Sequence, residues 1–498
     1  MPTTSNNAEN EFFTLSDGRY IMDADQSEKM YHIKQLQPET ASSFGGSDFG
    51  WDDSGTAALF AECYHDSARY CPEAKSWYTY SDGAWRKDVG ALLVSAKIKE
   101  FYRLMCIYCG EIVDEDLRQK FMKFTAKLGD RRTRERLLRD AADAMQISAA
   151  EFDANPYLIN CLNGTYDLFT MSFREHDWHD FLTMQTRFSY TLQDVRCERW
   201  EQFVDEVTSG DKDKAEYLQK ALGYSMLGMA NEECMFILHG KTTRNGKSTM
   251  LETIKHLLGD YAKDAPIGLI CKTNGMKNAE APSPVLASLK GKRFVTMQES
   301  EDSGRLDESA VKQYTGGESI TARNLHEAPI NFVPQFTLWM SCNDLPTVRD
   351  KSIFASERLR VVEFNRHFEK HEQDKTLKQE FQTAEAMRGI FSWLVAGYFK
   401  YRRFGLEMSD SMEGVIDEYR KSNDLILSFL EQKTARDSSE KIRSKELYDL
   451  YKIWCKSSGF YCCTIKAFNS GMDSHPEMYD ECRMSRGYKV YYGIKIAK

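Results

Sequence analysis

Apolar and polar residues recur with different periods along the chain, and these periods predict its main elements. The apolar run 234–238 predicts a buried strand, and residues 250–259 show helical spacing that ends at a glycine. Residues 75–85 alternate around an Asp-Gly pair, which is typical of a β-hairpin. Helical periodicity extends over residues 90–150 and returns at residues 200–227. The part before the apolar run is therefore predicted to be mainly helical.

The C-terminal part repeats a pattern of helices followed by strands. Helical spacing covers residues 371–402 and begins again at residues 424–431. Residues 444–455 form an amphipathic stretch in which Ser444 is the candidate N-cap. Residues 483–496 predict a hairpin. We expect these last elements to form a separate module.

Charge is distributed unevenly over these stretches. Residues 1–64 hold three of the 66 Lys/Arg residues and eleven of the 75 Asp/Glu residues. The remaining residues hold 63 Lys/Arg and 64 Asp/Glu, so they are close to neutral. The polar segment up to about residue 50 is expected to be an acidic, disordered tail. Residues 118–139 carry nine basic and two acidic side chains, which is typical either of a nucleic-acid contact or of a solvated helix face. Residues 425–498 carry thirteen basic and nine acidic side chains. This excess of positive charge favours DNA contact over a packing role alone.

Length and composition limit the protein class. The 498 residues suffice for two to four domains. No apolar run approaches the length of a membrane span and the polar N-terminus is no signal peptide, so we expect a cytoplasmic protein without membrane contact. The thirteen cysteines lack regular spacing, and the lone pair Cys106 and Cys109 does not predict a zinc site.

A glycine-bounded loop with a Gly-Lys-Ser sequence stands between the predicted strand at 234–238 and the helix that follows. Gly240 and Gly246 enclose five residues, one more than in the usual phosphate-binding loop. Backbone N–H groups of such a loop and the helix dipole bind phosphate oxygens. Lys247 would reach the β- and γ-phosphates, and the Ser248 hydroxyl would ligate Mg²⁺. The alternative is a glycine turn that precedes a helix by chance.

Polar residues end two further predicted strands. The β-rich run 293–301 ends in Glu299 and Glu301. A carboxylate at such a position can hold the metal or polarise the attacking water, and Glu299 is the first candidate. An ordinary strand that enters an acidic loop is the alternative. A second strand ends at Asn343, whose amide can orient the attacking water or contact the γ-phosphate.

Two arginines precede a later strand. Arg358 and Arg360 lie at the start of the β-rich run that ends at residue 364. A guanidinium fixed at such a place can neutralise the charge that develops on a transferred phosphoryl group.

This order of motifs closely resembles the superfamily 3 helicases, and more narrowly the poxvirus and phage/plasmid-type primase–helicase family. The resemblance covers about residue 51 to the C-terminus. It rests on Asn-Gly-Lys-Ser at the P-loop, on the Thr-Gly-Gly-Glu and Thr-Ala-Arg block of residues 315–323, and on the short spacing of the acid and the asparagine after the loop.

The resemblance implies an α/β fold with an AAA+ P-loop NTPase core, a mainly helical N-terminal domain and a winged-helix-like C-terminal module. The expected divisions are the tail 1–50, a helicase-associated domain 51–200, the helicase domain 201–370, a helical connector 371–424 and the module 425–498.

The resemblance also implies roles for single residues. ATP would bind at Gly240, Asn245, Gly246, Lys247, Ser248 and Thr249, with Mg²⁺ on Ser248 and Glu299. Lys247, Glu299 and Asn343 would be catalytic. Arg358 would reach the ATP of a neighbouring subunit, with Arg360 as the alternative.

The remaining implications concern DNA and partners. Arg323 to Glu327 falls where the family has a hairpin that grips single-stranded DNA, so Arg323 and His326 are candidate DNA contacts, together with Lys489 of the C-terminal hairpin. The resemblance implies a homo-hexamer on single-stranded or forked DNA. Many relatives carry a primase domain before this region; here about fifty residues precede it, so a separate primase is the expected partner.

Three functions fit these residues. The first is a ring helicase that replicates a phage, plasmid or other mobile element. The second is an ATPase that melts or remodels DNA without processive unwinding. The third is a small-molecule P-loop kinase, which would not need the asparagine, the arginines and the basic C-terminal module together.

Overall fold

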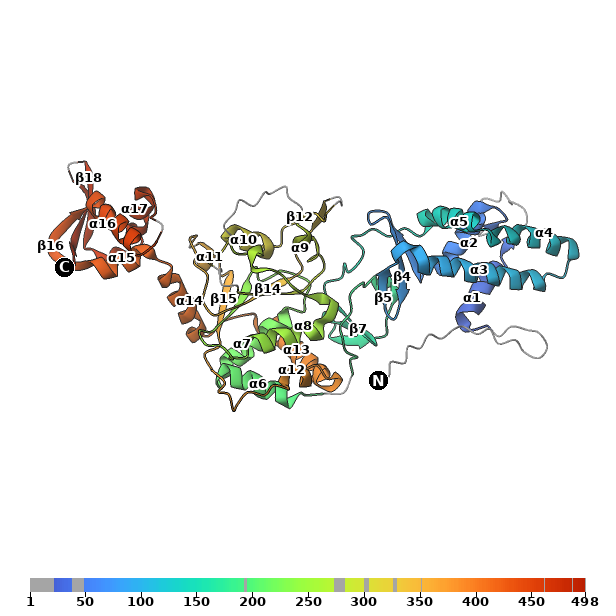
Figure 1. Cartoon of the computed structure of the whole chain (residues 1–498), viewed down its shortest axis with the longest axis horizontal. Coiled ribbons are helices and arrows are strands. Elements are labelled where there is room, and N and C mark those ends of the chain that lie inside the picture. The colour runs from blue at the N-terminus through green and yellow to red at the C-terminus, as the bar shows by residue number, and fades with distance from the viewer. Residues whose placement is uncertain are drawn as a thin grey trace. The chain divides into compact units, whose positions relative to one another are not determined.

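The computed structural model divides the chain into two compact units, Met1–Leu192 and Gln193–Lys498 (Figure 1). The structure describes residues 22–37, 49–191, 195–272, 283–299, 304–325, 329–350, 352–460, 462–485 and 487–497. In these ranges no helix is long and apolar enough to cross a membrane.

Five α-helices cover much of unit 1. They are α1 (Ala24–Ile33), α2 (Asp53–Tyr64), α3 (Leu92–Glu111), α4 (Glu115–Ala126) and α5 (Arg131–Ala144). Asp52, Asp114 and Asp130 cap α2, α4 and α5 by accepting a backbone N–H with the side chain, which explains where these helices begin. Phe60, Tyr64 and Phe101 pack together in the core between α2 and α3.

Part of the expected acidic tail is folded. Asp23 and Gln26 form a capping box at the start of α1, and Met30 and Ile33 are buried. The prediction of a disordered tail up to residue 50 was therefore wrong for residues 22–37, because a short amphipathic helix within an acidic segment still has an apolar face to bury. Residues 1–21 and 38–48 lie outside the described residues.

Unit 1 also contains two three-stranded antiparallel sheets, so it is less helical than expected. One consists of β3 (Ala68–Cys71), β4 (Ser76–Ser81) and β5 (Ala84–Lys87), and the other of β6 (Leu158–Cys161), β7 (Gly164–Asp167) and β8 (Ser172–Arg174). The short β1 (Leu36–Gln37) and β2 (Phe49–Gly50) pair in parallel. The predicted hairpin at 75–85 is confirmed: Asp82 and Gly83 both have positive φ, as a tight two-residue turn requires.

A five-stranded parallel sheet forms the centre of unit 2 and makes it an α/β structure. Its order is β10 (Ala262–Asp264), β11 (Phe294–Gln298), β14 (Thr337–Cys342), β9 (Met235–His239) and β15 (Leu359–Glu363). β9, β14 and nearly all of β15 are buried, which is why they were visible as apolar runs. The carboxyl ends of all five strands meet at one edge of the sheet.

Nine α-helices of the described residues precede, follow or separate the strands of this sheet in the chain. They are α6 (Glu198–Thr208), α7 (Lys212–Tyr224), α8 (Lys247–Leu258), α9 (Pro284–Ala287), α10 (Glu308–Thr315), α11 (Ser352–Ala355), α12 (Leu377–Glu380), α13 (Ala384–Phe404) and α14 (Asp410–Ser422). Phe236 stacks on Trp339 on one face of the sheet, and Trp339 donates a hydrogen bond to Ser225, just after α7. The stacked rings join β9 to β14, and the Trp339 hydrogen bond links these strands to the end of α7.

Two expected boundaries do not match the packing of these helices. A boundary at residue 200 would cut α6. The expected connector 371–424 contains α13, which packs directly on α7: a Cβ at Gly397 would lie 2.1 Å from the carbonyl oxygen of Gln219. α13 is therefore part of the α/β unit, and sequence periodicity gave no sign of that contact because it identifies helices and not their neighbours.

The C-terminal elements surround a core of their own. They follow in the order α15 (Leu425–Lys433), β16 (Thr434–Arg443), α16 (Ser444–Ser457), α17 (Ile465–Asp473), β17 (Glu481–Ser485) and β18 (Tyr488–Ile496), with sheet order β16-β18-β17. Phe429, Tyr451 and Phe468 are buried together. The hairpin and the amphipathic helix are confirmed. Ser444 is not the N-cap, however: that position is Arg443, and the Ser444 hydroxyl donates to Asn469 instead.

Candidate functional site

The loop between β9 and α8 has a backbone that only its two glycines permit. Gly246 has φ +88°, and a Cβ there would lie 2.4 Å from the Val207 side chain on α6. A Cβ at Gly240 would lie 2.4 Å from the Phe364 carbonyl oxygen and 2.5 Å from the Asn245 amide. The loop is thus packed closely against α6 on one side and against the chain after β15 on the other.

Lys247, the first residue of α8, extends across this loop. Its Nζ donates to the Gly240 carbonyl oxygen at 2.9 Å and to Asn343 Oδ1 at 3.1 Å. The side chain is only 5% exposed, and this burial lowers the pKa of Lys247 below its ordinary value. Two of the residues predicted to be catalytic are therefore in direct contact.

Glu299 joins the same cluster through the backbone. It follows β11, and its Oε2 accepts hydrogen bonds from the N–H groups of Asn343 and Asp344. The sheet order explains the geometry: β14 lies between β9 and β11, so the residue after β14 contacts both the lysine after β9 and the acid after β11. Lys247, Asn343 and Glu299 form one hydrogen-bonded chain at the carboxyl edge of the sheet.

The other predicted loop residues differ in exposure. Asn245 is buried and donates to the Thr242 carbonyl oxygen at 2.6 Å, which closes the loop on itself. Ser248 is exposed and Thr249 half-buried, both in the first turn of α8. The Ser248 hydroxyl and the Glu299 carboxylate are oxygen groups of the kind that bind a hard cation such as Mg²⁺. Glu301 lies outside the described residues.

The segment after β15 also holds the loop, which the sequence did not indicate. Phe364 N–H donates to the His239 carbonyl oxygen at 2.7 Å, and Phe368 N–H to the Arg244 carbonyl oxygen at 3.0 Å. His367 Nδ1 lies 2.8 Å from the Thr243 carbonyl oxygen. These contacts hold the backbone of Thr243 and Arg244 within the loop. They depend on strand order, so no local motif could have revealed them.

His239 is a second residue that the sequence did not single out. It ends β9, is 6% exposed, and its Nδ1 lies 3.8 Å from Glu363 Oε1 at the end of β15. Burial lowers the pKa of His239 despite this carboxylate, so the ring is neutral near pH 7. Its only sequence signal was its place at the end of a buried strand.

Arg358 lies at the opposite edge of the sheet from Lys247. It precedes β15, and β15 runs parallel to β9, so it belongs to the amino edge. Its guanidinium pairs with Glu233 at 2.6 Å and donates to the Thr315 hydroxyl at 2.8 Å. Arg360 is buried and pairs with Glu357 at 3.0 Å. Neither arginine contacts the cluster of its own chain.

The predicted DNA contacts lie elsewhere. β12 (Ile320–Ala322) and β13 (Ile330–Phe332) form an antiparallel hairpin, and the exposed Arg323 follows β12. His326 lies outside the described residues. Lys489 is on β18 of the C-terminal module, where its Nζ pairs with Asp473 at 2.6 Å.

Three family models match separate parts of the chain. "D5 N terminal like" matches residues 57–209, "Family of unknown function (DUF5906)" residues 238–360, and "Poxvirus D5 protein-like" residues 421–489. "Putative helicase L207/L206" of Acanthamoeba polyphaga mimivirus is 27% identical over an alignment of 484 positions that covers 90% of this chain and 50% of that protein. "Putative primase C962R" of African swine fever virus (isolate Pig/Kenya/KEN-50/1950) is 22% identical over 76% of this chain and 43% of its own length.

These matches support a D5-type viral helicase–primase family. The chain spans about half the length of the curated relatives it matches, or less. Among solved structures, the apo C-terminal region of NrS-1 (residues 305–718) matches with a TM-score of 0.46 and 11% identity, over 86% of this chain and 96% of that one.

Proposed function

We propose that this chain is an ATP-dependent ring helicase that moves on single-stranded DNA during replication of a virus, phage or other mobile element. The observation that supports this most is the hydrogen-bonded chain Lys247–Asn343–Glu299 beside a glycine-bounded loop and a helix N-terminus. The viral relatives named as helicases or primases indicate an enzyme that acts on DNA. The α/β unit would then be an AAA+ P-loop core, and the C-terminal module a winged helix.

The cluster has the groups that hydrolysis of a phosphoanhydride needs. Lys247 would exchange its bonds to Gly240 and Asn343 for the β- and γ-phosphates. This exchange would free the Asn343 amide to orient the attacking water, which Glu299 would polarise. Mg²⁺, held by the Ser248 hydroxyl and, directly or through water, by Glu299, would neutralise phosphate charge when it is bound. Phosphate binding and the catalytic acid would therefore be linked through one asparagine.

The position of Arg358 fits a shared site. It is too far from Lys247 of its own chain, because the full length of β15 separates it from the carboxyl edge of the sheet. In a ring, the amino edge of one subunit would face the ATP of the next, and Arg358 would leave Glu233 for the γ-phosphate. A homo-hexamer with ATP between subunits is the proposed assembly.

DNA would be contacted by the hairpin β12–β13 with Arg323 and by the C-terminal module. In that module, Lys489 is paired with Asp473, whereas Arg483 and Lys441 lie over Tyr492 at 4.4 and 5.8 Å from the ring centroid. Basic side chains beside a partly exposed aromatic ring suit a sugar–phosphate backbone that must be bound regardless of sequence.

The direct test is ATP hydrolysis and fork unwinding by the purified chain beside Lys247→Ala. The matched control is Lys255→Ala, which removes the same charge from the same helix at the Asp264 ion pair. We expect single-stranded DNA to stimulate hydrolysis, and Lys247→Ala to lower it by roughly 10²–10³-fold, with Lys255→Ala close to the unaltered chain.

Two outcomes would change the proposal. DNA-stimulated hydrolysis without fork opening would indicate a remodelling ATPase in place of a processive helicase. Hydrolysis that neither depends on Lys247 nor responds to DNA would contradict the motor function altogether.

A further inference from the structure

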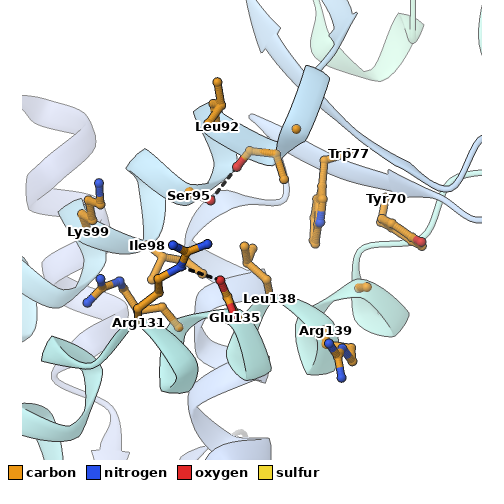
Figure 2. Close-up of a pocket in the computed structure, with 14 residues that line it drawn as sticks. Tyr70, Trp77, Leu92, Ser95, Ile98, Lys99, Arg131, Glu135, Leu138 and Arg139 are labelled. Carbon is orange, nitrogen blue, oxygen red and sulfur yellow. Dashed lines mark hydrogen bonds and ion pairs between the residues drawn. The ribbon is translucent and has the colours of Figure 1, made fainter.

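Unit 1 contains a pocket of about 800 Å³ that none of the predicted site residues line. It is bounded by Tyr70 of β3, Trp77 of β4, the start of α3 and one face of α5 (Figure 2). Pockets of roughly 300–1,000 Å³ are the usual size for small organic ligands. The pocket can therefore hold a group as large as a nucleotide.

The apolar wall of the pocket is aromatic. The rings of Tyr70 and Trp77 are 5.4 Å apart at their centroids with an angle of 60°. Ile98 and Leu138 extend this wall, and Leu92 is 72% exposed at its edge. An aromatic wall with an exposed leucine offers a surface on which an unstacked base can pack.

The polar wall is basic, with four cationic side chains and one acidic one. Arg131 pairs with Glu135 at 2.7 Å, and Arg134 donates to the carbonyl oxygens of Leu128 and Gly129. These two cations already have partners within the unit, as the dashed line between Arg131 and Glu135 in Figure 2 illustrates.

The other two cations, Lys99 and Arg139, have no ion-pair partner in the part of the chain that the structure describes. Both are exposed, one on α3 and one on α5. In Figure 2, Arg139 lies on the side of Tyr70 and Trp77, whereas Lys99 lies on the side of Arg131. The pocket therefore presents one free charge beside the aromatic wall and a second at its other end.

We infer that this pocket binds a nucleotide unit of single-stranded DNA, with the base against Tyr70 and the backbone phosphates on Arg139 and Lys99. Each of the two cations can contact a phosphate of the strand, and the aromatic wall accepts any base. The inference is independent of nucleotide hydrolysis because no residue of the Lys247 cluster takes part. It gives unit 1 the function of holding a strand.

The test measures binding of fluorescein-labelled oligothymidylate to the full chain by anisotropy over a range of salt concentrations. Lys247→Ala is present throughout, so that the proposed ATP site does not contribute. The pocket variant combines Lys99→Ala with Arg139→Ala, and the matched control combines Lys75→Ala with Lys87→Ala, two exposed lysines of unit 1 outside both the pocket and the basic stretch 118–139. Thermal unfolding checks that all variants are equally folded.

We expect the pocket variant to weaken binding by roughly tenfold. The slope of log affinity against log salt should fall by about 1.4, at about 0.7 for each lost phosphate contact to a single strand. Tyr70→Leu should weaken binding by a similar factor without a change in the salt slope, because it removes stacking and no charge.

The same variants are titrated with labelled thymidine monophosphate, which separates a strand from a free nucleotide. Weaker binding of the oligonucleotide with unchanged, poor binding of the monophosphate would support the strand. Equal loss for both ligands would show that a free nucleotide occupies the pocket, and the strand proposal would be overturned. Equal affinity of the pocket and control variants for the oligonucleotide would overturn it as well, whether or not the chain hydrolyses ATP.

Discussion

At the scale of single residues, the site depends on an asparagine that connects two charged groups. Asn343 accepts from Lys247 through its side chain and donates to Glu299 through its backbone. Spacing along the sequence had suggested each of the three residues separately, from its place after a strand. Their mutual contact follows from the order of the strands, which the sequence did not show.

Asn343→Ala should reduce kcat for ATP hydrolysis by about 10²-fold and change KM little, because the amide is proposed to act on the water and not on ATP binding. The control is Asn231→Ala, an exposed asparagine in the loop before β9. Steady-state kinetics with saturating single-stranded DNA provide both constants. A large rise in KM with unchanged kcat would instead give Asn343 a role in binding.

At the scale of elements, close helix packing determines where the glycine-bounded loop after β9 lies. α6 contacts the loop at Gly246, and α7 is held against α13 by glycines on both helices. Gly223 and Gly397 leave no room for a Cβ, whereas Gly414 on α14 has no atom within 4 Å of that position. A glycine is therefore required by close packing on α13, whereas on α14 a larger residue would fit.

Gly397→Ala should destabilise the protein by about 1–3 kcal/mol, because the new methyl group would overlap the Gln219 backbone. Gly414→Ala should stabilise it by up to about 1 kcal/mol through helix propensity alone. Denaturant unfolding of the two variants beside the unaltered chain makes the comparison. Equal effects of the two substitutions would mean that α7 and α13 are not packed as closely as described.

An ion pair between Lys312 and Asp350 links α10 to the loop before α11. Its contribution to the stability of the fold depends on pH. Asp350 accepts hydrogen bonds from Lys312 Nζ and from the Ser352 backbone N–H, and hydrogen bonds from these two residues lower its pKa from 3.8 to about 2. A carboxylate with a lowered pKa stabilises the fold fully above its unfolded pKa and loses this contribution as the pH falls through the folded pKa. Asp350→Asn should therefore be less stable than the unaltered chain at neutral pH, and the difference should shrink as the pH falls from about 4 to about 2. Melting temperatures across this range measure it. A difference at pH 2 as large as the difference at neutral pH would contradict the assignment.

At the scale of the whole molecule, the two edges of the central sheet carry different parts of the proposed site. Lys247, Asn343 and Glu299 occupy the carboxyl edge, while Arg358 occupies the amino edge and is paired with Glu233. One chain cannot bring these parts together, so the proposed site requires a second copy.

Arg358→Ala alone should lower hydrolysis by roughly 10³–10⁵-fold, the range for an arginine supplied in trans. Mixing it with Lys247→Ala should restore part of the activity, because some interfaces would combine an intact Lys247 with an intact Arg358. Hydrolysis measured over a series of mixing ratios tests this. Arg420→Ala, which removes an exposed arginine of α14 paired with Asp417, serves as the control. No recovery at any ratio would restrict Arg358 to its contact with Glu233.

Local patterns in the sequence determined many of the elements and predicted the type of chemistry. The apolar run at 234–238, the glycines of the loop and the polar residues after three strands are short-range signals, because buried strands and tight turns restrict residue type position by position. Tertiary structure alone decided that β14 lies between β9 and β11, that residues 364–368 support the loop, that α13 belongs to the core and that Tyr70 and Arg139 line one pocket. Each of these joins residues far apart in the chain, and their proximity is set by packing, which periodicity does not encode.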